Sequence, residues 1–268
     1  MKKVLYPINA FLLCVVMLFS ACETDNSITG GDDEEEASKC GEASNSLVDS
    51  YADDAVRLAI RSLNSSESVI DPSIIIPPAL VERMSNILTA IHASEFSAAD
   101  SVTNVYEVHI NALSSLTQVS LLVDNSAAWA EGWINGEYLT GEPSIDQLLT
   151  TYDLEVTQTV QYANFLGVTI TSEELINTTE LAVKFASVDG VSEATVPSDG
   201  TGDGDDIVVD ILGANDLYKV TYEVAYDGCS ETCQKARFYE FNVDDNCNVT
   251  YINTYGDAPP TEAEREEE

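Results

Sequence analysis

The last third of the chain carries the strictest pattern in the sequence. Tyr218, Val220, Tyr222, Val224 and Tyr226 alternate with other residues, and a period of two places such residues on one face of a β-strand. Residues 238–243 and 249–255 repeat the pattern after turns, which predicts an antiparallel β-meander over about residues 206–256. An exposed tyrosine face would bind a glycan or a peptide, whereas a buried one is core. We expect core, because the preceding helices need an apolar surface to cover.

Two amphipathic helices are predicted near the start of this folded region. Residues 44–64 place apolar side chains three and four residues apart, after Ser46 as a potential N-cap. The second helix follows Pro77-Pro78, and proline is favoured where helices begin. Residues 102–110 alternate apolar and polar side chains, which predicts a strand.

The middle of the chain predicts the order β-α-β-β-α-β, the split βαβ arrangement of ferredoxin-like folds. Thr171 and Glu174 have the spacing of a capping box and are expected to open the second of these helices. The class is therefore α+β, with N-terminal helices, a split βαβ segment over about residues 116–197 and the C-terminal meander. The expected elements are a strand at 119–123, a helical region at 126–152, strands at 154–162 and 168–170, a helix from 171 and a strand at 190–196.

The step from Leu181 through Phe185 to Asp189-Gly190-Val191 resembles the end of the inhibitory propeptides of subtilisin-like proteases. In that family a helix closes on a Gly-Val turn and the final strand runs towards the protease. The resemblance implies that residues 197–206 form an extended segment able to lie in a protease cleft. Ferredoxin-like domains serve many unrelated purposes, so the fold alone assigns no function.

The N-terminus has the pattern of a secretory signal. Two lysines precede an apolar run and small residues in MKKVLYPINAFLLCVVMLFSAC, and the run is too short for an ordinary bilayer span. The ending Leu18-Phe19-Ser20-Ala21-Cys22 resembles a bacterial lipobox, although Phe19 stands where a smaller aliphatic residue is usual. The resemblance implies a signal peptide over residues 1–21 and diacylglycerol on the Cys22 thiol. An ordinary signal peptide with a chance cysteine is the alternative.

Both ends of the remaining chain are predicted to be disordered. Residues 22–42 contain the acidic run Asp32–Glu36 and no apolar periodicity, and residues 257–268 are similarly acidic; such segments cannot bury enough surface to offset their chain entropy. An acidic tether after a lipidated cysteine resembles the export signals of surface lipoproteins in the Bacteroidota. The whole chain resembles uncharacterised secreted lipoproteins of that phylum, which implies an outer-membrane lipoprotein of the cell envelope with its ectodomain, residues 43–256, displayed at the surface.

Composition excludes some partners. The chain has 44% hydrophobic residues, too many for a disordered acidic protein, and its 47 acidic against 11 basic residues give a net charge of −36. Nucleic acid would be repelled, because binding it requires Lys and Arg to neutralise phosphates. Residues 43–256 alone hold 33 acidic and 7 basic residues, so the acidity belongs mainly to the folded surface. We interpret it as adaptation to a saline exterior that screens self-repulsion.

The cysteines suit an oxidising compartment. Once Cys14 has left with the signal peptide and Cys22 carries lipid, four cysteines remain: Cys40, Cys229, Cys233 and Cys247. Cys229 and Cys233 lie in one short turn and can close on each other, which leaves Cys247 for Cys40, although four cysteines allow three pairings. A zinc site is the competing interpretation. Disulfides are favoured because no CxxC pair or neighbouring histidine is present.

One segment has the spacing of a calcium loop. Asp199, Thr201, Asp203, Asp205 and Asp210 fall at positions 1, 3, 5, 7 and 12, where oxygen ligands are needed, and Gly204 falls at the position of the sharp turn. An EF-hand requires helices on both sides and a glutamate at position 12, whereas strands and Asp210 are expected here. The alternative is a solvated acidic loop between two strands. Calcium is the only cofactor that the sequence suggests.

Catalytic motifs are not apparent. His92 is expected to pack at the edge of the second helix, and His109, beside Glu107, is expected to be a surface histidine. Trp129 and Trp133 lie one helical turn apart and suit either a sugar platform or, more simply, a core anchor. We therefore expect a lipid-anchored envelope protein that acts as a non-enzymatic binding or structural module for a protein or glycan. The alternatives are a protease-inhibitor module and, third, a hydrolase that uses carboxylates alone.

Overall fold

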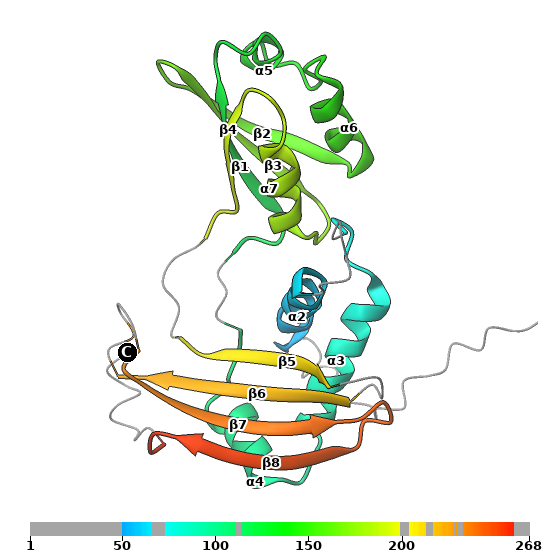
Figure 1. Ribbon diagram of the computed structural model, residues 1–268, viewed down its shortest axis with the longest axis vertical. Helices are drawn as coiled ribbons and strands as arrows, with labels where there is room; N and C mark the ends of the chain where they lie inside the picture. Colours follow the sequence, from blue (N-terminus) through cyan, green and yellow to red (C-terminus); the bar gives the residue numbers. More distant parts are fainter. Residues whose placement is uncertain are drawn as a thin grey trace, which may run out of the picture. The chain divides into compact units, whose positions relative to one another are not determined.

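The computed structural model describes residues 50–65, 73–110, 114–198, 204–212, 217–227, 229 and 233–259. Within these residues the chain is a mixture of helices and strands that includes two four-stranded antiparallel sheets (Figure 1). The predicted α+β class is therefore confirmed. The predicted signal peptide, the tether up to residue 42 and most of the predicted tail lie outside the described residues. No helix in the described ranges has the length and apolar composition needed to cross a bilayer.

The two N-terminal helices are α2 (Ala52–Ser65) and α3 (Pro78–His92). Helix α2 buries a stripe that contains Ala55, Leu58 and Ala59. Helix α3 begins at a proline, as expected, and no side chain caps its N-terminus. Both helices contribute to one hydrophobic core together with strands of the C-terminal sheet.

Residues 102–110 do not form the predicted strand. Helix α4 (Ser97–Asp100) continues into a π-helical turn, η1 (Ser101–Val105), and Glu107 then adopts a left-handed backbone conformation with φ of 49°. Ala99 and Val102 are buried and lie three residues apart, with Tyr106 four residues further on. This helical spacing is easily missed because Ala99 is small and the larger apolar residues happen to alternate.

The C-terminal sheet has the order β5-β6-β7-β8, so each strand pairs with the next along the chain. Its strands are β5 (Asp206–Leu212), β6 (Leu217–Tyr226), β7 (Lys235–Val243) and β8 (Val249–Gly256). Tyr218, Tyr222 and Tyr226 of β6 are at most 3% exposed, which confirms that the alternating tyrosines are core. Beyond β8, Asp257 donates its backbone N–H to Ala236, and the Tyr226 hydroxyl donates to the Ala258 carbonyl. The first residues of the predicted tail are therefore held against this sheet.

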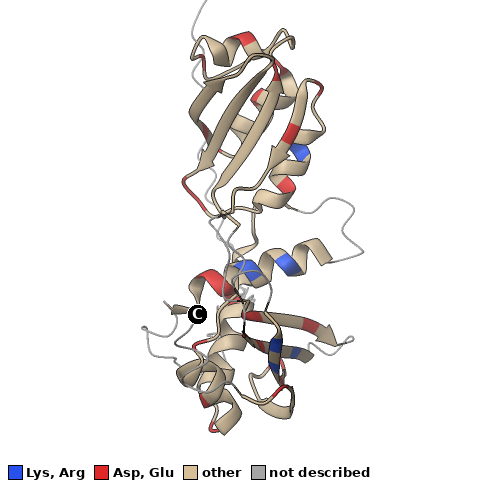
Figure 2. Cartoon of the chain, turned by 90° about the vertical axis from the view of Figure 1, so that its left-hand side faces the viewer, with Lys and Arg blue, Asp and Glu red and all other residues tan. Residues whose placement is uncertain are grey.

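The central sheet has the order β2-β3-β1-β4, and all neighbouring strands are antiparallel. Its core contains buried side chains of α5 (Ala130–Ile134), α6 (Pro143–Thr151) and α7 (Thr178–Ala186), together with those of β1, β2 and β3, so one face of the sheet is covered. Figure 2 shows the strands from the other face. In chain order the elements are β1 (Gln118–Asp124), α5 (Ala130–Ile134), α6 (Pro143–Thr151), β2 (Leu154–Gln161), β3 (Phe165–Ser172), α7 (Thr178–Ala186) and β4 (Val191–Thr195).

Two predicted helix boundaries in this region are wrong. The helical region expected over residues 126–152 consists of two short helices, α5 and α6, with a connection at residues 135–142. The helix expected from Thr171 begins at Thr178, because the Asn177 side chain accepts the Glu180 N–H as the N-cap. Thr171 lies instead within β3, where it pairs with Gln118. The Ser172 hydroxyl accepts the Glu174 N–H, a local turn that has the composition of a cap without a following helix.

Candidate functional site

The cysteines are found partly as expected. Cys229 and Cys233 form a disulfide across the turn between β6 and β7, which confirms that pairing. Cys247 is also disulfide-bonded, and its partner lies outside the described residues. The predicted lipidation site Cys22 and the predicted partner Cys40 also lie outside the described residues.

The predicted calcium loop is described only in part. Asp199, Thr201 and Asp203 lie outside the described residues. Asp205 precedes β5 and uses one carboxylate oxygen, Oδ1, to accept the Ala225 N–H at 2.7 Å. Asp210 lies within β5, and its backbone is opposite that of Lys219 in the antiparallel pairing of β5 with β6. Among the described residues, no group of three or more His, Cys, Asp or Glu side chains is placed to hold a metal ion. Calcium binding at this loop therefore stays a prediction.

The two tryptophans anchor the core of the central sheet. Trp133 is 1% exposed, and its ring lies edge-on to that of Trp129 with 5.5 Å between centroids. The Trp129 indole N–H donates to the Asp189 carbonyl at 3.0 Å, which ties α5 to the turn before β4. These contacts favour the core interpretation over a sugar platform.

The face of the central sheet shown in Figure 2 contains a groove of about 360 Å³. It is a mixed surface, because hydroxyl and amide side chains alternate with small and apolar ones. Ser120 and Leu122 of β1 form its middle, and Tyr162, 56% exposed, stands at its β2 side. The other side chains that line the groove are Gln158, Val160, Thr169, Glu193 and Thr195.

The backbone of Gly167 forms part of the groove floor and makes room for the tyrosine ring. A Cβ atom at this position would lie 3.1 Å from the Cε2 atom of Tyr162, closer than carbon atoms normally pack. The ring is also placed by the β2–β3 hairpin, in which the Tyr162 N–H donates to the Phe165 carbonyl at 2.7 Å. Glycine therefore lets Tyr162 lie over the floor of the groove.

Charge is sparse along this sheet. Its four strands contain only three charged residues, Asp124, Glu155 and Glu193, and Glu193 is the one that lines the groove. In a chain with 47 acidic residues, a nearly neutral surface of hydroxyls, an amide and one exposed aromatic ring is unusual. Such a surface suits an uncharged ligand with many hydroxyl groups, since aromatic faces and polar side chains together orient it.

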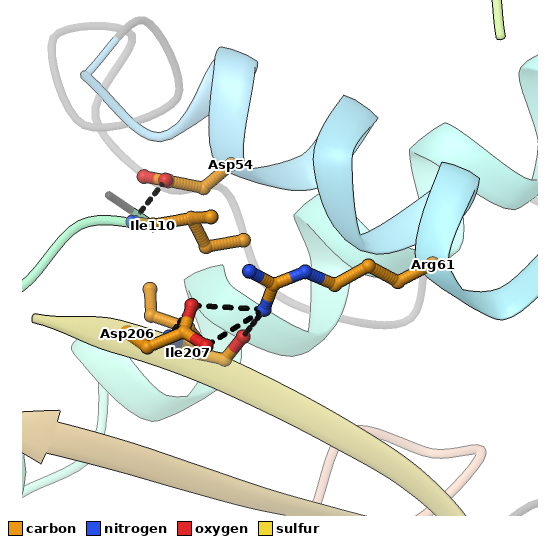
Figure 3. Close-up of polar contacts among 5 residues, drawn as sticks. All are labelled: Asp54, Arg61, Ile110, Asp206 and Ile207. Atoms are coloured by element: carbon orange, nitrogen blue, oxygen red, sulfur yellow. Dashed lines mark hydrogen bonds and ion pairs between the residues drawn. The ribbon is translucent and has the colours of Figure 1, made fainter. Parts of the chain in front are cut away.

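A second polar cluster lies inside the core shared by α2 and the C-terminal sheet. Asp54 on α2 is 3% exposed, and its Oδ1 accepts the backbone N–H of Ile110 at 2.7 Å (Figure 3). Its other oxygen, Oδ2, lies 2.6 Å from Nδ1 of His109. An ionised carboxylate can only accept hydrogen bonds, so Nδ1 of His109 is the donor to Asp54 in that form of the pair. His109 is exposed, as expected for a surface histidine, and it is also the partner of a buried acid, which the sequence did not indicate.

One aromatic ring packs directly against this carboxylate–imidazole pair. The ring of Tyr51 lies 4.6 Å from that of His109 between centroids. Burial, followed by the negative charge of Asp54, raises the pKa of the Tyr51 hydroxyl far above its ordinary value. Burial likewise raises the pKa of Tyr222, with Tyr51 and Asp54 contributing, and burial lowers the pKa of His92. Both tyrosines therefore stay neutral at physiological pH.

A nearby ion pair joins the same helix to the first strand of the C-terminal sheet. Arg61 Nη1 donates to Asp206 Oδ1 at 2.8 Å and to the Ile207 carbonyl at 2.8 Å (Figure 3). Both side chains are about one third exposed, so solvent weakens the attraction. Together with Asp54, this pair fixes how α2 lies on its neighbours.

The sequence contained signals for both features. Asp54 lies three residues after Tyr51, on the stripe of α2 that faces the core, and an acid on a buried stripe implies a polar partner. The groove residues of β3, Gly167 and Thr169, alternate with the buried Leu166, Val168 and Ile170. Neither signal identifies the partner segments, because His109 and Glu193 are far from these residues in sequence. No family model, curated protein or solved structure matches this chain.

Proposed function

We propose that the chain is a lipid-anchored protein of the bacterial cell envelope, carried on the outer membrane and displayed at the surface, that binds a neutral glycan without catalysing a reaction. The observation that carries the binding role is the groove on the central sheet. The exposed ring of Tyr162 can stack on the apolar face of a sugar, and the hydroxyl and amide side chains that line the groove can form hydrogen bonds with sugar hydroxyls. The lipobox-like sequence ending at Cys22 supports the anchor.

Lipid attachment is tested by metabolic labelling with an alkyne-bearing palmitate in a Gram-negative expression host. The wild-type chain should incorporate the label and fractionate with membranes, and Cys22→Ser should abolish both. Cys14→Ser is the matched control, because this cysteine lies in the expected signal peptide and should leave labelling unchanged. Equal labelling of wild type and Cys22→Ser would reject the anchor.

Glycan binding is tested by calorimetry with neutral oligosaccharides, such as six-residue β-glucans and oligomers of N-acetylglucosamine. Tyr162→Ala should weaken binding at least tenfold, because it removes the exposed ring from the groove. Tyr255→Ala is the control, since Tyr255 is 42% exposed but lies on the C-terminal sheet. Equal losses in the two variants, or retention of binding by Tyr162→Ala, would reject the groove as the site. If a protein binds the groove in a Tyr162-dependent way and no glycan does, the ligand of the groove is a protein and the glycan proposal is rejected.

A protease-inhibitor module is the second candidate, and two observations favour it. The central sheet has the strand order β2-β3-β1-β4, with helices after β1 and after β3. We propose that this region is a ferredoxin-like split βαβ unit. Helix α7 ends shortly before Gly190, which has a φ of 93° and leads directly into β4. Incubation with a subtilisin-type protease should slow cleavage of a reporter peptide at micromolar concentrations of the chain. Simple degradation of the chain would count against this function.

A further inference from the structure

Helices α2 and α3 leave a pocket of about 580 Å³ between them, separate from the groove on the central sheet. This volume is within the range of small-molecule sites, which extends from about 300 to 1,000 Å³. Apolar side chains form most of its wall. They are Ala52, Ala55 and Val56 of α2, Pro78 and Val81 of α3, Ile76 before α3, and Leu175 before α7.

The polar part of the pocket lining is acidic. Asp53 and Glu82 are exposed, and Ser85 is the only other polar residue among the described lining residues. None of the described lining residues is basic, and the arginines of the two helices, Arg57, Arg61 and Arg83, lie outside the lining. A negative potential is therefore expected at the rim of an apolar pocket.

We propose that this pocket binds the alkyl chain of an amphiphile with a positively charged head group. The apolar wall removes the chain from water, which is favourable in proportion to the apolar area buried. The carboxylates of Asp53 and Glu82 attract a cationic head and repel the carboxylate, sulfate or phosphate of an anionic amphiphile. This ligand class is distinct from the glycan proposed for the groove, and the two sites share no lining residue.

The head-group preference is tested with two probes that have the same alkyl chain, dodecyltrimethylammonium and dodecyl sulfate. Calorimetry on the purified protein, below the micelle concentration of either probe, should show one saturable site for the cation with affinity at least tenfold above that for the anion. Butyltrimethylammonium should bind at least tenfold more weakly than the dodecyl cation. Equal affinity for the butyl and dodecyl cations would show adsorption to the acidic surface alone and would overturn the proposal.

The location is tested by filling the pocket from its edge. Ala52→Phe places a large ring at an exposed lining position, and it should reduce affinity for the dodecyl cation at least tenfold. Ala79→Phe is the matched control, because Ala79 is exposed in the first turn of α3 and does not line the pocket. Unchanged affinity in Ala52→Phe would reject this pocket.

Methyl NMR keeps the test independent of any folding defect in the variants. The dodecyl cation should shift the methyl resonances of Val56 and Val81 and leave Val208, an exposed valine on β5, unchanged. Glu82→Gln should reduce the ratio of the affinity for the dodecyl cation to the affinity for dodecyl sulfate. Glu95 is an exposed acid beyond the end of α3, and Glu95→Gln should leave this ratio unchanged. Shifts spread over all surface methyl groups would contradict a defined site.

Discussion

The substitution Asp54→Ala should destabilise the fold more than the loss of any neighbouring acid. Asp54 accepts two hydrogen bonds in the core, one from the Ile110 N–H at 2.7 Å and one from the His109 ring at 2.6 Å. Removing the carboxylate leaves the Ile110 N–H without an acceptor at a residue that is only 6% exposed. The His109 side chain is 45% exposed, so water can partly replace its lost partner.

These contacts set the expected magnitude. An unpaired buried N–H costs about 1–3 kcal/mol. The lost bond to His109 contributes roughly 1 kcal/mol, because solvent exposure of the imidazole reduces a charge-assisted bond to the strength of an ordinary hydrogen bond. Asp54→Ala should therefore lower the free energy of unfolding by about 2–4 kcal/mol. His109→Ala should cost less, about 1 kcal/mol, because Asp54 keeps its bond to Ile110.

Urea unfolding at pH 7, followed by far-ultraviolet circular dichroism, measures the difference, and exchange of the Ile110 amide hydrogen reports on the bond itself. Asp53→Ala is the control. Asp53 is exposed in the same first turn of α2, so both variants lose the same favourable interaction with the helix dipole. If Asp54→Ala and Asp53→Ala differ by less than about 1 kcal/mol, or if Ile110 exchange is unchanged, the buried carboxylate does not have the role described.

Three further outcomes follow from single features. Gly190→Ala should lower the melting temperature, because Gly190 has a φ of 93° and an added Cβ would lie 2.8 Å from the Cβ of Ala127; an unchanged melting temperature would contradict this packing. Hydrogen bonds from the side chain and backbone of Asn248 lower the pKa of Asp244. Their contribution to the stability of the fold is therefore complete above the unfolded-state pKa of Asp244 and is lost as pH falls through the folded-state pKa. Asn248→Ala should raise the Asp244 pKa in an NMR titration. The protein should melt at a higher temperature in 1 M NaCl than in dilute buffer, because salt screens the repulsion among its acidic residues; a lower melting temperature in salt would refute the saline interpretation.

Local patterns predicted the elements whose residues interact with near neighbours in sequence. The period of two in β6 identified the strand and its buried tyrosines, and Pro78 marked the start of α3. Prediction was poorer where short side chains decided the outcome. Ala99 carries the helical spacing of α4 and η1, and Asn177 caps α7 in place of the expected Thr171.

The sequence by itself determined the α+β class, the C-terminal strand order of local hairpins and the closeness of Cys229 to Cys233, because each depends on residues within one hairpin or one helix. Only the tertiary structure decided that Asp54 meets His109, which is 55 residues away. It also placed Glu193 of β4 opposite Leu122 of β1, on the groove that Tyr162 borders. Such pairs depend on how the chain returns to itself, and neither composition nor periodicity encodes that path.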